Sequence, residues 1–129
     1  MKRDSDRWYR RIVRDCKASD YKAGREVNLE NYVQSSQLEE MQNTQQNKCW
    51  YCQEQMCWLE RRSARNGLTC ERRDNSRSHE ADNCCLACKR CNSRKFSYER
   101  GLLMRYFCIW KHNALGIRAP QTNRRCTFV

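Results

Sequence analysis

The sequence lacks a long apolar run, and this excludes a membrane-spanning helix. Its longest apolar stretch extends from Leu102 to Trp110 and is interrupted by Arg105, whereas a span needs about 20 apolar residues. Residues 1–6 are mostly charged and lack the apolar region of a secretory signal peptide. We therefore expect an intracellular protein in a reducing compartment.

Apolar residues are scarce in the whole chain. Hydrophobic residues make up 39% of the 129 residues, and charged residues make up 32%. A single domain of this kind has a small core, and small cores usually need staples. Cysteine is the candidate present in quantity, with 11 residues. In a reducing compartment, clustered cysteines bind metal more often than they form disulfides, and a disulfide framework stays the minor alternative.

Acidic residues are missing from one end of the chain, and the charge is strongly unbalanced. The formal net charge is +11, from 26 Lys and Arg against 15 Asp and Glu. Residues 1–26 hold nine basic and five acidic residues, and residues 101–129 hold five basic and no acidic residue. Two basic arms around a cysteine-rich centre indicate a polyanionic partner, and we expect nucleic acid. No segment pairs a basic face with a wide apolar one, so we expect no membrane contact.

Local patterns predict a mixture of helices and short strands. Ser36 and Glu39 have the spacing of a capping box, and Asn66-Gly67 has the composition of a tight turn. Gly101 is expected to end a helix as its C-terminal cap. The expected strands lie at 57–59, 68–70 and 84–87, and the expected helices at 36–46, 89–100 and 102–114.

Two C-x-x-C pairs predict a structural zinc site. Cys49 and Cys52 form the first pair, Cys88 and Cys91 form the second, and 35 residues separate them. Two such pairs complete a closed tetrahedral Cys₄ site for Zn²⁺. Cys85 and Cys88 offer another register for the second pair, but the basic residues between Cys88 and Cys91 favour the first choice.

The other cysteines are not part of this predicted zinc site. Cys84 and Cys85 are interpreted as small apolar residues of a buried strand, and Cys57 and Cys70 as strand residues. The remaining three are too scattered in the sequence to assign, and a second metal site built from them has little support: Cys16, Cys108 and Cys126.

The run from Glu71 to Asn83, continued by Cys91-Asn92, resembles the HNH endonucleases, which have the ββα-metal fold. The resemblance covers about residues 36–100, and zinc-stapled members bracket this unit with two C-x-x-C pairs, as here. It implies an α+β fold in which residues 36–100 form the stapled module. Residues 1–35 would be a basic N-terminal arm, and residues 101–129 a C-terminal helix with a basic tail.

The resemblance also implies roles for individual residues. Glu71 matches the acidic ligand, and Asn92 the helix ligand, of a catalytic Mg²⁺ or Mn²⁺ ion. Asn83 matches the asparagine that steadies the loop. Arg72 occupies the place of the general-base histidine, and because arginine stays protonated it can only bind phosphate. His79, seven residues further on, is the expected substitute base.

Together these roles imply an endonuclease that hydrolyses phosphodiester bonds of DNA, with DNA favoured over RNA. The alternative is an inactive zinc protein that binds DNA or RNA structurally. Basic side chains on or beside the helix of the second pair are expected to contact backbone phosphates: Lys89, Arg90, Arg94 and Lys95. One stripe of apolar residues is expected to form core or dimer surface, which leaves a homodimer open: Leu103, Phe107 and Trp110.

Overall fold

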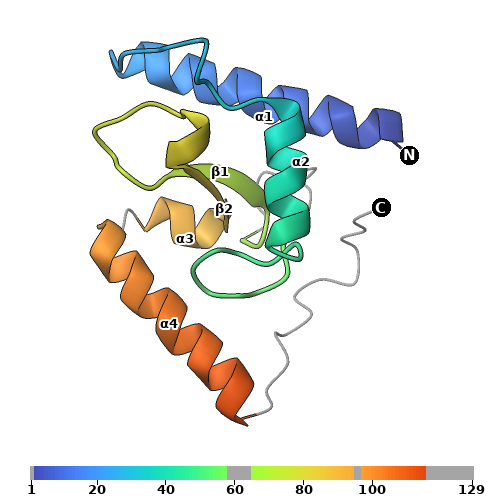
Figure 1. Cartoon of the computed structure of the whole chain (residues 1–129), viewed down its shortest axis with the longest axis vertical. Coiled ribbons are helices and arrows are strands. Elements are labelled where there is room, and N and C mark those ends of the chain that lie inside the picture. The colour runs from blue at the N-terminus through green and yellow to red at the C-terminus, as the bar shows by residue number, and fades with distance from the viewer. Residues whose placement is uncertain (1, 58–64, 95–96, 116–129) are drawn as a thin grey trace.

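The computed structural model describes residues 2–57, 65–94 and 97–115 (Figure 1). It is a small α+β structure, as predicted, with four α-helices, one 3₁₀-helix and a two-stranded sheet. The elements in chain order are α1 (Lys2–Lys22), α2 (Ser35–Thr44), β1 (Leu68–Arg72), η1 (Ala81–Asn83), β2 (Cys84–Cys88), α3 (Lys89–Ser93) and α4 (Tyr98–Leu115).

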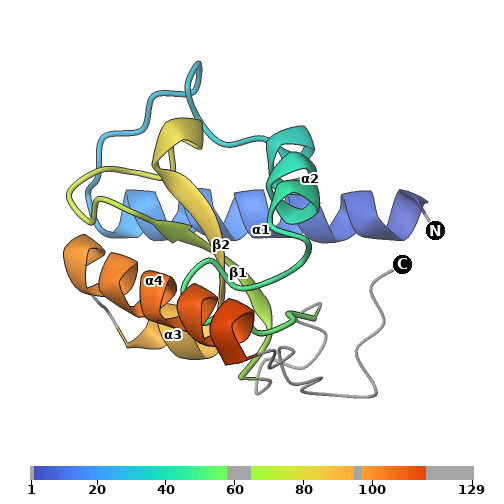
Figure 2. The ribbon, with the colours of Figure 1, turned by 60° about the horizontal axis from the view of Figure 1, so that its bottom comes forward.

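Strands β1 and β2 pair antiparallel, with Glu71 opposite Cys85 and Cys70 opposite Leu86. Successive side chains of a strand point to opposite faces, so Cys70 and Glu71 lie on different faces of the sheet. Figures 1 and 2 show α1 on one side of the sheet and α3 with α4 on the other. The predicted strands at 68–70 and 84–87 are confirmed and extend slightly further.

Cysteine supplies much of the core. Among the described residues, nine of the eighteen buried apolar side chains are cysteines. Helix α1, which lies in the expected basic arm, contributes Tyr9 and Cys16 to this core, and the Tyr9 hydroxyl donates a hydrogen bond to Gln42 of α2. The large apolar contribution of α2 is Leu38, which is fully buried. Because the core contains so few aliphatic side chains, its stability depends on the cysteine side chains.

The N-cap of α2 lies two residues before the predicted one, and the helix begins at Ser35 instead of residue 36. Gln34 is the N-cap, and its backbone N–H donates to the side chain of Gln37 at 2.8 Å. The predicted capping pair, Ser36 and Glu39, therefore lies inside the helix. The two glutamines form the capping pair because Gln34, with its extended backbone, is the last residue before the helix begins at Ser35.

The predicted single helix at 89–100 is wrong. Helix α3 ends at Ser93, and Gly101 lies inside α4 instead of capping a helix end. A Cβ atom at Gly101 would clash with the ring of Tyr51, which is only 2% exposed. Glycine is thus required here for close packing of α4.

Of the predicted strand at 57–59, only Cys57 is described, and it forms an isolated bridge with Gly67.

Substituting Gly101→Ala is expected to destabilise the fold by about 1–2 kcal/mol. Alanine favours helix by up to about 1 kcal/mol, but overpacking of a buried ring costs about 1–3 kcal/mol. Thermal and urea unfolding measure the difference. Asn113→Ala, at an exposed position of the same helix, is the control and should be neutral or slightly stabilising; a Gly101→Ala protein as stable as this control would contradict the packing argument.

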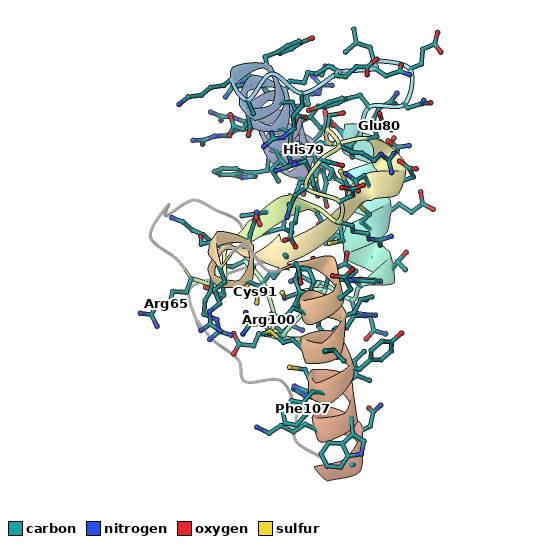
Figure 3. All side chains as sticks on the ribbon, turned by 90° about the vertical axis from the view of Figure 1, so that its left-hand side faces the viewer. Arg65, His79, Glu80, Cys91, Arg100 and Phe107 are labelled. Atoms are coloured by element: carbon teal, nitrogen blue, oxygen red, sulfur yellow. The ribbon has the colours of Figure 1, made fainter. Side chains whose placement is uncertain are left out.

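The aromatic stripe of α4 does not belong to the core. The exposed fractions of Leu103, Phe107 and Trp110 are 71%, 60% and 59%. The prediction that this stripe forms core is therefore wrong. Figure 3 shows α4 extending away from the sheet with Phe107 near its far end.

None of the helices in the described ranges is long and apolar enough to cross a membrane.

Candidate metal centres and cavity

Two turns bring the predicted zinc ligands together. In the turn after α2, the Cys49 N–H donates to the Glu54 carbonyl at 2.8 Å, and Gln53 adopts a positive φ of 65°. At the other turn Cys88 caps α3, and its sulfur accepts a hydrogen bond from the Cys91 N–H at 3.5 Å. All four thiols are buried between these two turns.

The geometry of the four thiols fits zinc. The Sγ atoms of Cys49, Cys52, Cys88 and Cys91 all lie within 4.8 Å of one another, and those of Cys52 and Cys88 are 3.8 Å apart. A tetrahedral site with Zn–S bonds of about 2.3 Å separates its sulfurs by about 3.8 Å. Contacts among the four thiols lower the pKa of Cys52 and Cys88 and raise the pKa of Cys49 and Cys91, and a bound Zn²⁺ would hold all four as thiolates.

The alternative register is wrong. The Cys85 side chain lies on the sheet face of Glu71, with its sulfur 3.9 Å from the Glu71 carboxylate.

Cys57, interpreted as a strand residue, is disulfide-bonded, while the other nine cysteines of the described ranges are free thiols. Cys126 lies outside the described residues.

A cavity of about 300 Å³ lies beside β1. Its walls include all four residues predicted for catalysis: Glu71, Arg72, His79 and Asn92. Cys16 of α1 and Cys70 of β1 also line it. The predicted site residues therefore meet one common space, although they come from a strand, a loop and a short helix.

Glu71 and Asn92 form the oxygen-rich side of this cavity. Burial raises the pKa of Glu71 to about 7, although a hydrogen bond from Tyr51 and the charge of Arg72 act in the opposite direction. The Asn92 amide nitrogen donates to the Thr69 hydroxyl at 3.0 Å, on the face of β1 that carries Glu71. This leaves the amide oxygen and the carboxylate as donors, and such oxygens suit Mg²⁺ or Mn²⁺.

The loop after β1 fixes the position of Arg72. One guanidinium nitrogen of Arg72 donates to the carbonyl oxygens of Asn75 and Arg77, the second at 3.1 Å. The Asn83 side chain accepts from the Asp74 N–H at 2.8 Å and donates to the Asp74 carbonyl at 3.0 Å. The prediction that Asn83 steadies this loop is confirmed.

His79 sits in a setting that does not suit a general base. Its Nδ1 lies 2.9 Å from Asp20 Oδ2, and its backbone N–H donates to the same oxygen at 3.0 Å. Burial lowers the pKa of His79, but contacts with Cys16 and Asp20 outweigh burial and raise it to about 9. Without a bound metal, the imidazole is then protonated at neutral pH and cannot accept a proton. Its surroundings favour another role.

Sequence reasoning missed the contribution of α1 to this region. Cys16 and Asp20 are four residues apart and therefore lie on one helical face, together with the buried Tyr9 and the partly buried Ile12. That spacing marks the face that packs on the sheet. It does not reveal that the face meets His79, because 59 residues separate Asp20 from His79 in the chain.

The predicted phosphate-binding residues are placed unevenly. Arg94 is exposed and Lys89 is half-buried. Arg90 is in an ion pair with Glu54, at 3.5 Å. Lys95 lies outside the described residues. In the turn that carries Cys49 and Cys52, the ring of Trp50 lies under the guanidinium group of Arg105 of α4, 3.6 Å from the ring centroid.

Comparison with known proteins adds no relative: no protein-family model, curated protein or solved structure matches the chain.

Proposed function

We propose that this protein is a metal-dependent endonuclease with a zinc-stapled, HNH-like ββα-metal module, and that its substrate is DNA. The observation that carries the proposal is that Glu71, Arg72 and Asn92 line the same cavity. An acidic ligand, an amide ligand and a fixed guanidinium in one space can hold a divalent ion and a phosphate group, which are two of the requirements of phosphodiester hydrolysis. The net charge of +11 supports a polyanionic substrate.

Each of these residues has a separate task in the proposed reaction. Glu71 and Asn92 would hold the divalent ion through oxygen atoms. The ion would supply positive charge to the scissile phosphate and make an attacking water acidic enough to lose its proton to the solvent. Arg72 would bind a phosphate oxygen, and the loop carbonyls that hold its guanidinium limit the side-chain entropy lost on binding. Exposed Arg94 would contact the backbone of the nucleic acid.

A second candidate is a protein that binds DNA or RNA without cleaving it. The setting of His79 favours this candidate, because a histidine held by Asp20 and grouped with Cys16 and Cys70 leaves the cavity without a histidine base. The zinc staple and the basic surface would be the same in both cases. The two candidates differ only in whether the cavity binds a catalytic ion.

A plasmid-nicking assay distinguishes the two candidates. The full chain is purified with zinc under reducing conditions and incubated with supercoiled DNA and Mg²⁺ or Mn²⁺. We expect nicking that stops when the divalent ion is omitted; omission is preferable to a chelator, which would also remove structural zinc. Tight, salt-dependent binding without cleavage under either ion would contradict the endonuclease proposal and support the binding protein.

A further inference from the structure

A second group of metal-binding side chains lies away from the Cys₄ cluster. It comprises Cys16 of α1, Cys70 of β1 and His79 of the loop before η1, all of them buried. One ligand atom from each residue lies within 4.8 Å of the others. Figure 3 shows His79 beside α1 and Cys91 on the other side of the strands, so the two groups are separate.

The orientation of His79 is that of a metal ligand. Its Nδ1 is taken by Asp20 at 2.9 Å, which leaves Nε2 as the atom for a metal. Asp20 is fully buried and is itself held by the Tyr32 hydroxyl at 2.5 Å and by Arg25 at 2.9 Å. A carboxylate that fixes the second ring nitrogen is the usual partner of a zinc-bound histidine, because it sets the tautomer and the ring orientation.

The thiols provide the remaining donors. Cys16 and Cys70 come from α1 and β1, and both thiols are buried within reach of the His79 ring. Two sulfurs and one imidazole nitrogen form a Cys₂His donor set, which favours zinc among the common biological cations and leaves the fourth position of a tetrahedral ion to a water molecule. Without a metal, these polar thiols would be buried beside an imidazole.

We propose that Cys16, Cys70 and His79 bind a second zinc ion. This ion joins α1 to β1 and to the loop before η1, so it anchors the N-terminal helix to the stapled module. It also assigns His79 a ligand role in place of the base role expected from the sequence. The proposal does not depend on nuclease activity.

Metal content tests this proposal directly. The full chain, expressed with zinc and purified under reducing conditions, is expected to hold two zinc ions by mass spectrometry, and Cys16→Ala and His79→Ala are each expected to hold one. Cys108→Ala, which removes a half-buried thiol of α4, is the control and should keep both. One zinc in the unmodified chain, or two in both variants, would overturn the proposal.

Cobalt substitution keeps the test valid if a variant does not fold. In the unmodified chain, Co²⁺ should give two sets of absorption bands, one from a tetrathiolate site and one from a site with two sulfurs and one nitrogen. A tetrathiolate spectrum alone, at saturating Co²⁺, would exclude the second site whatever the activity of the protein.

Discussion

The double variant Cys49→Ser, Cys88→Ser is expected to lose the folded state. A structural zinc site contributes about 10–16 kcal/mol of binding free energy to folding, whereas small domains are stable by only about 5–15 kcal/mol. The aliphatic core here is too small to compensate, because half of the buried apolar side chains in the described ranges are cysteines. Circular dichroism and thermal unfolding of the purified variant measure the loss.

The matched control for the zinc variant is Cys108→Ser. It replaces a free, half-buried cysteine outside both metal groups, so it tests the chemical change without the loss of a ligand. We expect it to melt within a few degrees of the unmodified protein. A cooperative transition at the unmodified temperature in the double variant would show that the Cys₄ cluster does not hold the fold together.

Substituting Glu71→Gln is expected to lower the rate of DNA cleavage by about 100- to 1,000-fold. The carboxylate is the only negatively charged donor proposed for the catalytic ion, and an ion on the phosphate stabilises the transition state by several kcal/mol, with about 1.4 kcal/mol for each factor of ten. Glutamine has nearly the same shape, and Glu71 is 7% exposed, so the fold should persist. Single-turnover nicking rates at fixed Mg²⁺ measure the effect.

Glu99→Gln is the control for charge. It removes one acidic group from an exposed position in the first turn of α4, away from the cavity. We expect its cleavage rate to match that of the unmodified protein, and we expect both variants to bind DNA with similar affinity. Cleavage by Glu71→Gln at the unmodified rate would remove Glu71 from the proposed mechanism.

The features that local spacing determines were predictable from the sequence. The C-x-x-C pairs fix two thiols each on a short turn, so Cys49, Cys52, Cys88 and Cys91 were identified without a structure. The β1–loop–β2 order placed Asn83 correctly, because its partners Asp74 and Ser78 are near it in the chain.

The features that depend on distant packing were not predictable. Glycine is common at the ends of helices, so the sequence predicts a helix end at Gly101. Only the close packing of the Tyr51 ring against this position shows why glycine is needed within α4. His79 has the spacing of a catalytic base, but its role depends on Cys16 and Asp20, which a separate helix brings to it. Long-range contacts of this kind leave no periodic pattern in a single sequence.

Anomalous diffraction from crystals of the zinc-loaded protein soaked in Mn²⁺ tests the central claim most directly. Data on either side of the manganese absorption edge separate manganese from zinc. The proposed endonuclease requires a manganese peak in the cavity, bound by the Glu71 carboxylate and the Asn92 amide oxygen and distinct from zinc at the Cys₄ cluster. A cavity without manganese at saturating concentration would contradict catalysis by a metal ion at this site.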